Sequence, residues 1–174
     1  MFYEINEKTI PMIPDAPGCY WLVKKIDKGS PHPIGRVSGI DQHGILYIGQ
    51  SKSLRNRFKE MLKQFNSKTT EVSAIAKAGH PASYEWHISS RNKISHPLNT
   101  IFYVFEKIDK SEDTVKKELI YLTNYRDMFG EYPPWNQSPS NFKKYLPVNN
   151  PQGFAPLKFD YSCDTWLPPI MRNK

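Results

Sequence analysis

Apolar and polar residues along the chain follow two periodicities, one typical of strands and one typical of helices. Two apolar runs, GCYWLVKK at 18–25 and ILYIG at 45–49, are bounded by glycine or proline and predict strands. The run TIFYVFEKI at 100–108 is apolar on both faces, which is typical of a central strand. The stretch YEWHI at 84–88 alternates and predicts a half-buried strand. Since nothing between the first two runs resembles a crossover helix, we expect them to pair antiparallel.

A helix is predicted directly after the second of these strands. Ser51 and Ser53 can each act as its N-cap, because a serine hydroxyl accepts a hydrogen bond from a free backbone N–H of the first turn. At about 100° per residue, Arg55 and Arg57 lie on opposite shoulders of its apolar stripe. The apolar stripe of this helix consists of Leu54, Phe58, Met61, Leu62 and Phe65. A further short helix is expected near 70–79.

A longer helix is predicted over about 111–129, with Ser111 or Asp113 as its N-cap. An acid, Glu118, falls inside the apolar and aromatic face of this helix. Burying a carboxylate is costly unless it is paired or coordinated. The residues alone leave three alternatives: a salt bridge to a neighbouring lysine or arginine, a side chain that reaches water, or a metal ligand. The apolar stripe consists of Val115, Leu119, Leu122 and Phe129.

These elements together predict an α+β fold, in which helices flank a small antiparallel β-sheet. We expect one domain over residues 1–137, with an insertion at about 27–44 that forms a long turn rich in glycine and proline. Residues 138–174 are rich in proline and aromatic residues. This composition favours an irregular tail that packs on the domain or holds a partner.

Composition and charge narrow the function. A formal charge of +7 on 174 residues favours a polyanionic partner such as nucleic acid. No run approaches the roughly 20 apolar residues that span a membrane, and the N-terminus lacks the pattern of a signal peptide, so we expect a soluble cytoplasmic protein. The two cysteines and five histidines show no zinc pattern. Neither a phosphate-binding glycine loop nor a serine-hydrolase motif is present. What remains is tyrosine, arginine and one glutamate on an apolar helix face, which suits phosphodiester hydrolysis with a divalent metal.

Several motifs in order resemble the GIY-YIG nuclease superfamily, which includes the nucleotide-excision repair nuclease. They are GCY at 18–20, LYIG at 46–49 and the segment YIGQSKSLRNRF, which places an arginine ten residues after Tyr47. Glu118 in KKELIYLTNY and Asn136 in PPWNQ match the metal-binding glutamate and the asparagine of that family. The resemblance covers about 18–137.

The resemblance implies a fold, an activity and a set of site residues. The two motifs would form paired strands of a small antiparallel sheet, and the next helix would present its arginine to the scissile phosphate. Glu118 would hold one Mg²⁺ or Mn²⁺ ion. Either tyrosine could act as the base for in-line attack by water, leaving 5′-phosphate and 3′-hydroxyl ends. The catalytic residues carried over are Tyr20, Tyr47, Arg57, Glu118 and Asn136.

Four further residues are expected to contact DNA: Gln50, Lys52, Arg55 and, from the insertion, Arg36. The chain departs from the family pattern at Met61, where several relatives place a histidine or tyrosine one turn past the arginine. Because one active site cuts one strand, double-strand cleavage would require a homodimer or two successive events.

The predicted function is a metal-dependent DNA endonuclease of restriction or phage type. The alternatives are a structure-specific repair nickase and a catalytically silent DNA-binding module with the same fold. A protein-interaction domain would show no salt-sensitive binding to DNA, whereas phosphate contacts make affinity fall steeply with salt.

Overall fold

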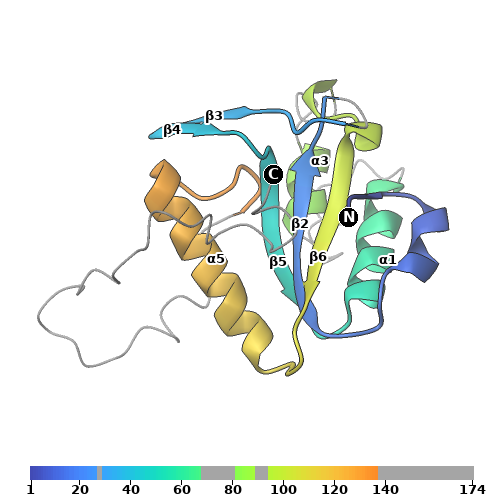
Figure 1. The fold of residues 1–174 in the computed structure, drawn as a ribbon. Coiled ribbons are helices and arrows are strands. Elements are labelled where there is room, and N and C mark those ends of the chain that lie inside the picture. The colour runs from blue at the N-terminus through green and yellow to red at the C-terminus, as the bar shows by residue number, and fades with distance from the viewer. Residues whose placement is uncertain (27–28, 68–80, 89–93, 137–174) are drawn as a thin grey trace, which may run out of the picture.

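A computed structural model describes residues 1–26, 29–67, 81–88 and 94–136 (Figure 1). Strands and helices alternate irregularly along the chain, and the longest helix comes last. In chain order the elements are β1 (Tyr3–Glu4), η1 (Glu7–Met12), β2 (Gly18–Lys24), β3 (Ile34–Arg36), β4 (Gly39–Asp41), β5 (Ile45–Ser51), α1 (Leu54–Phe65), α3 (Pro81–Ile88), η2 (Leu98–Thr100), β6 (Ile101–Lys107) and α5 (Asp113–Phe129).

The main sheet has four antiparallel strands in the order β1-β6-β2-β5. The two motif strands, β2 and β5, pair directly, so that Tyr20 lies opposite Gly49. On its other side β2 pairs with β6, which confirms the predicted central strand. The predicted α+β class and the antiparallel pairing are both confirmed. In the described part of the chain, β5 is an edge strand with no further strand beyond it.

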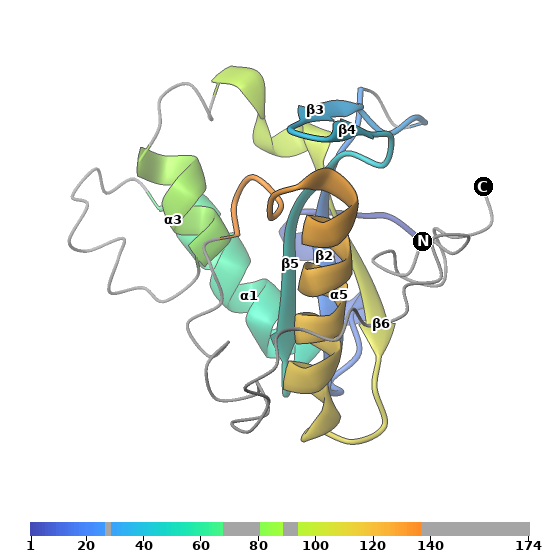
Figure 2. The same cartoon turned by 90° about the vertical axis from the view of Figure 1, so that its left-hand side faces the viewer.

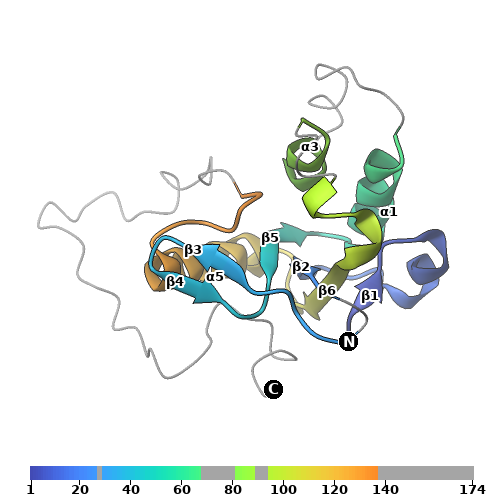
Figure 3. The same cartoon turned by 90° about the horizontal axis from the view of Figure 1, so that it is seen from above.

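Helices cover both faces of this sheet (Figures 1 and 3). Helix α1 lies with η1 and α3 on one face, and α5 lies on the other. Side chains of each strand alternate between the two layers. Along β2, Tyr20 and Leu22 join the core on the α1 side, whereas Cys19, Trp21 and Val23 join the core on the α5 side.

The first predicted helix is confirmed as α1. Ser53 is its N-cap, and its hydroxyl accepts a hydrogen bond from the backbone N–H of Asn56 at 3.1 Å. The backbone N–H groups of Leu54 and Arg55 donate to carbonyls of the segment before β2, at 2.9 and 3.1 Å. These bonds satisfy free donors of the first turn and hold the helix against the start of β2. All five residues of the predicted stripe are buried.

The predicted strand at 84–88 is wrong, because these residues belong to helix α3. Trp86 packs edge-on against Phe65 of α1, with ring centroids 5.3 Å apart, and a ring nitrogen of His87 lies 2.7 Å from the Gln64 carbonyl oxygen. Contact with the end of α1 therefore stabilises a helix where five alternating residues suggested a strand. The helix predicted near 70–79 lies outside the described residues.

The insertion at 27–44 is more ordered than the predicted long turn, because it contains the hairpin β3–β4. This hairpin lies across the C-terminal end of α5 (Figure 1). The backbone N–H of Ser38 donates to the Phe129 carbonyl at 3.0 Å. The Arg36 side chain bonds to the Tyr132 carbonyl and forms an ion pair with Glu131 at 3.3 Å. The insertion is thus built onto the domain.

Helix α5 differs from its prediction in two ways. Its N-cap is Glu112, without a side-chain capping bond, and neither Ser111 nor Asp113 has that role. The buried face is also rotated, since two tyrosines with bonded hydroxyls pack where the apolar pattern placed Val115 and Leu119. Both of those residues are partly exposed. The buried residues are Thr114, Tyr121, Leu122, Tyr125 and Phe129.

None of the helices in the described ranges is long and apolar enough to cross a membrane. The predicted tail at 138–174 lies outside the described residues, and the domain boundary at 137 stays a prediction.

Candidate active site

Two tyrosines on neighbouring strands form one side of the site. Tyr20 of β2 and Tyr47 of β5 point to the α1 side of the sheet, with ring centroids 5.9 Å apart. Their hydroxyl groups share a hydrogen bond. A Cβ atom on Gly49 would lie 2.6 Å from the Tyr47 ring and 2.7 Å from the Tyr20 hydroxyl, which is closer than real Cβ contacts. The glycine of the second motif therefore allows the two tyrosines to meet.

Glu118 reaches the same strand from the opposite face of the sheet. The backbone N–H of Gln50 on β5 donates to its carboxylate. The Gln50 side chain is held in turn by the Thr114 hydroxyl, which donates to it at 3.0 Å. Strand β5 runs between α1 and α5 (Figure 2), so side chains from both helices can meet at this strand. An edge strand has no neighbouring strand to separate them.

Burial raises the pKa of Glu118 to about 7, and the charge of Arg57 and the Gln50 hydrogen bond oppose this rise. No lysine or arginine in the described ranges forms an ion pair with Glu118 within 4.0 Å. The adjacent Lys117 pairs with Glu106 instead, at 2.7 Å. The salt-bridge alternative for Glu118 is therefore wrong for this part of the chain. The carboxylate is held in place by a backbone donor but lacks a close cation.

Arg57 of α1 connects the two sets of groups. Its charge lowers the pKa of Tyr20, Tyr47 and Glu118, so it lies within electrostatic reach of all three. One terminal nitrogen forms an ion pair with Glu60 at 3.2 Å, while its Nε is buried without a hydrogen-bond partner. The side chain is 30% exposed. Part of the guanidinium thus faces solvent, where a phosphate could approach.

The chemistry of the tyrosines is constrained by their surroundings. Burial raises the pKa of both Tyr20 and Tyr47 above the ordinary value of 10. The positive charge of Arg57 acts in the opposite direction at both hydroxyls. A phenolate at neutral pH would therefore require further positive charge, or else the tyrosines orient water as neutral hydroxyls.

Asn136 lies along the outer edge of β5. Its side-chain amide donates to the Ile48 carbonyl and accepts from the Ile48 N–H, both at 2.8 Å. The neighbouring Trp135 N–H donates to the Leu46 carbonyl at 2.9 Å. These bonds hold β5 in the stretch that carries Tyr47, so the described role of Asn136 is to hold the strand. Contact between Asn136 and a substrate stays a prediction.

The residues expected to contact DNA fall into two groups. Lys52 is exposed at the start of α1. Arg55, by contrast, donates from Nε to the Ile13 carbonyl at 2.8 Å, so it fastens α1 to the segment after η1. Gln50 is occupied by Thr114.

Arg36 is engaged within the fold. Its side chain is only 6% exposed, and it contacts Glu131 and the Tyr132 carbonyl. In this structure it ties the hairpin to the segment after α5, and contact with DNA stays a prediction. Arg36 was expected to be exposed because it lies in a glycine-rich insertion. No residue near it in the sequence indicates its distant partner, Glu131.

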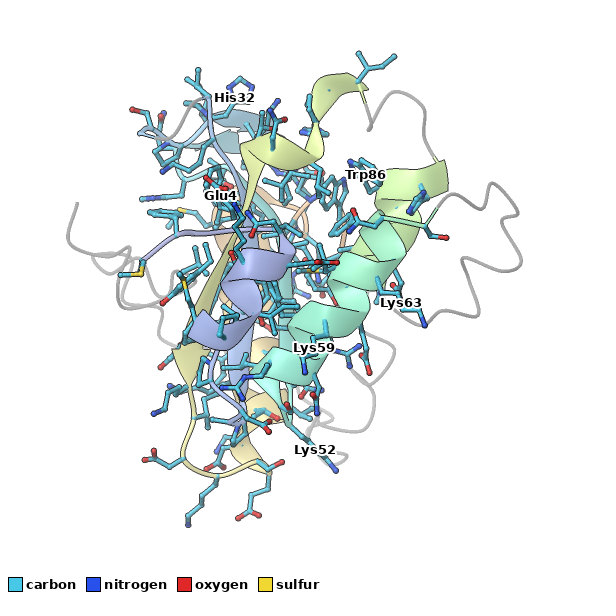
Figure 4. The ribbon with its side chains drawn as sticks, turned by 90° about the vertical axis from the view of Figure 1, so that its right-hand side faces the viewer. Glu4, His32, Lys52, Lys59, Lys63 and Trp86 are labelled. Atoms are coloured by element: carbon cyan, nitrogen blue, oxygen red, sulfur yellow. The ribbon has the colours of Figure 1, made fainter. Side chains whose placement is uncertain are left out.

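Three further residues were given no role from the sequence. Lys59 and Lys63 are exposed on α1, and Lys52 is exposed just before this helix (Figure 4). The spacing of four residues between Lys59 and Lys63 places them on one helix face. Tyr103 of β6 stacks on Tyr20 with ring centroids 5.2 Å apart. Its place in a predicted central strand could have singled out Tyr103, since a buried hydroxyl needs a hydrogen-bond partner.

The donor set suits a magnesium or manganese ion better than a metal that prefers several protein ligands. Over the described ranges, no group of three or more histidine, cysteine, aspartate or glutamate side chains could hold a metal. Mg²⁺ keeps several waters and is often bound by one or two carboxylates together with substrate phosphate. The single carboxylate of Glu118, without a close cation, fits that mode of binding.

Neither a known protein-family model nor a curated protein matches the chain. Among solved structures, the chain is similar to the GIY-YIG N-terminal endonuclease domain of UvrC from Thermotoga maritima, bound to magnesium. The identity is 19% and the TM-score 0.33, over 75% of this chain and 93% of that one. Two point mutants of the same domain, bound to its catalytic divalent cation, match at 18% identity with the same TM-score and coverage.

Proposed function

We propose that this chain is a metal-dependent DNA endonuclease of the GIY-YIG type. The observation that carries the proposal is the convergence of three kinds of group at the edge of β5. A partly buried carboxylate without a close cation in the described ranges, Glu118, comes from one layer, and Arg57 comes from the other. Two hydrogen-bonded tyrosines, Tyr20 and Tyr47, lie on the strands between them. A packed core does not require this combination, whereas phosphodiester hydrolysis can use every member.

Glu118 is the residue that would hold Mg²⁺ or Mn²⁺. When bound, the ion neutralises charge on the phosphate and stabilises the leaving 3′ oxygen. The Gln50 N–H lies next to the carboxylate and favours its charged form. Binding of a cation also removes the cost of an ionised carboxylate at a buried position.

Arg57 would bind the non-bridging oxygens of the scissile phosphate. Its guanidinium offers forked donors that match phosphate geometry. To do so it exchanges Glu60 for the phosphate, and Glu60 is 60% exposed. Exposed ion pairs of this kind contribute only about 0–1 kcal/mol, so the exchange costs little.

The tyrosines would orient the attacking water and receive its proton. Attack of the water oxygen on phosphorus breaks the bond to the 3′ oxygen, which leaves with the bonding electrons and takes a proton from solvent to become the 3′-hydroxyl, while the phosphate stays on the 5′ oxygen. Because burial raises both tyrosine pKa values, a tyrosine must first lose its own proton, which Arg57 favours. Either Tyr47 or Tyr20 could be the base that receives the proton of the attacking water.

DNA would approach across the exposed face of α1. Lys59 and Lys63 are exposed on this helix, and Lys52 is exposed just before its first turn (Figure 4). Phosphate contacts from lysines supply most of non-specific DNA affinity and make it dependent on salt. We propose a restriction-type or phage-type enzyme, with homodimerisation as the route to cutting both strands. The alternatives are a structure-specific repair nickase and a silent DNA-binding module of the same fold.

The first test is cleavage of supercoiled plasmid with Mg²⁺ or Mn²⁺ by the wild type and by Glu118→Ala. Glu112→Ala is the matched control, because it removes an exposed acid from the start of the same helix. We expect metal-dependent cuts by the wild type and the control and none by Glu118→Ala. Sequencing gels then separate discrete sites from general cutting. Cleavage that survives Glu118→Ala would refute the site assignment, and DNA binding without any cleavage would favour the binding module.

A further inference from the structure

Tyr103 lies beneath the candidate site, on β6, two strands away from β5. It is fully buried on the α1 side of the sheet, opposite Leu22 in the register. Its ring stacks on Tyr20, with centroids 5.2 Å apart, and meets Phe58 of α1 edge-on at 5.1 Å. Phe58 follows Arg57 in the chain. Tyr103 therefore packs between a candidate catalytic tyrosine and the turn of α1 that carries the arginine.

Two polar atoms at this place have no partner among the described residues. One is the hydroxyl oxygen of Tyr103 and the other is Nε of Arg57, and both are buried. A buried polar group without a hydrogen bond costs about 1–3 kcal/mol, so such groups are rare in native proteins. One of them is a donor and the other can accept. Burial raises the pKa of Tyr103, and Arg57 partly lowers it, so the guanidinium lies within electrostatic reach of the hydroxyl.

The hydroxyl is not needed for packing. A phenylalanine would fill nearly the same volume and keep both ring contacts without burying an unpaired oxygen. The same strand carries Phe102 and Phe105, so an aromatic ring without a hydroxyl is tolerated on either side. On helix α1, Glu60 pairs with a terminal nitrogen of Arg57 at 3.2 Å, and the buried residue one turn beyond the arginine is Met61, which offers Nε no strong acceptor. The hydroxyl of Tyr103 is thus the acceptor that β6 supplies beneath the arginine.

We infer that Tyr103 is a positioning residue, whose hydroxyl accepts the Nε–H of Arg57 through a small side-chain rotation or one buried water. This bond anchors the inner edge of the guanidinium, while its outer amino groups exchange Glu60 for a phosphate. The inference rests on the proposed function for its effect on catalysis, but the pairing itself is a property of the free protein. Tyr103 touches neither metal nor DNA in this role.

Tyr103→Phe tests the inference against a matched substitution, Tyr125→Phe. Tyr125 is also a buried tyrosine, but it lies on α5 and donates to Asp41 at 3.0 Å. For Tyr103→Phe we expect a melting temperature lowered no more than in the control, unchanged DNA affinity, and a single-turnover cleavage rate about 10- to 100-fold lower, because the arginine loses its orientation. For Tyr125→Phe, which also loses one buried hydrogen bond, we expect a lowered melting temperature and a normal cleavage rate. A normal cleavage rate in Tyr103→Phe would overturn the catalytic part of the inference.

A second measurement does not depend on activity. The Nε–H signal of Arg57, identified in ¹⁵N spectra by its loss in Arg57→Lys, should exchange slowly with solvent in the wild type. In Tyr103→Phe we expect the signal to shift and to exchange at least about tenfold faster, as a lost hydrogen bond of roughly 1.4 kcal/mol implies. The same signal in both proteins would overturn the pairing. If the signal changes but the wild type cuts no DNA, the pairing stands and the proposed function fails.

Discussion

Replacing Glu118 by glutamine should stabilise the protein at high pH and leave it unchanged at low pH. Burial raises the pKa of Glu118 from the ordinary 4.5 to about 7 in the folded protein. The folded state therefore holds a proton that the unfolded chain has lost once the pH exceeds 4.5. The stability that this proton contributes is fully present below pH 4.5 and is lost as pH rises through about 7. Glutamine resembles the protonated acid and still accepts from the Gln50 N–H.

The magnitude follows from the two pKa values. At about 1.4 kcal/mol per pKa unit, the rise from 4.5 to about 7 corresponds to roughly 3 kcal/mol. We expect the free energies of unfolding of wild type and Glu118→Gln to agree near pH 4. Between pH 4.5 and 7 the variant should gain stability over the wild type, and above pH 7 the difference should level off at up to about 3 kcal/mol.

Urea unfolding followed by circular dichroism between pH 4 and 8.5 measures this difference. The series is then repeated at pH 8 with Mg²⁺, which should stabilise the wild type and have little effect on Glu118→Gln. Glu112→Gln is the control, since that acid is exposed and should show no such pH dependence. A stability difference independent of pH, or a variant less stable than the wild type at pH 8, would refute the assignment of Glu118 as a partly buried carboxylate without a close cation.

Two further predictions concern DNA binding and the tyrosine pair. The double variant Lys59→Gln, Lys63→Gln should bind duplex DNA more weakly, and the slope of log Kd against log salt should fall by up to about 0.9 for each lost phosphate contact. Lys110→Gln, outside α1, is the control for the change in net charge. An unchanged salt slope in the double variant would place DNA on another face. Gly49→Ala should destabilise the fold by about 1–3 kcal/mol and lower cleavage at least about tenfold, because the new Cβ displaces both tyrosine rings. Gly35→Ala is its control, because a Cβ there meets nothing within 4 Å. Normal cleavage by Gly49→Ala would contradict a role for the tyrosine pair.

Local sequence was sufficient for the elements whose pattern is strong. The motif strands and helix α1 have long apolar runs, a serine cap and a regular stripe, and the structure confirms each of them. Tyr20, Tyr47, Arg57 and Glu118 were found through their motifs, and the structure brings them to one edge of the sheet. Whether they act as assigned stays a prediction.

Other features depend on contacts between distant segments. Residues 84–88 form a helix because Trp86 and His87 pack on the end of α1. The Arg36 side chain is buried because the hairpin meets the segment after α5, where its partner Glu131 is 95 residues away in sequence. Such partners cannot be identified from a local window, since nothing in the flanking residues indicates them.

The sequence by itself determined the antiparallel motif strands, the capped helix that presents Arg57, and the presence of an acid on the buried face of α5. Only the tertiary structure decided that Glu118 has no close cation in the described ranges, and that it meets Arg57 and the tyrosines at the edge of β5. The physical reason is that periodicity reports which face of an element is buried. The partners that a buried polar group finds depend on how separate elements pack together.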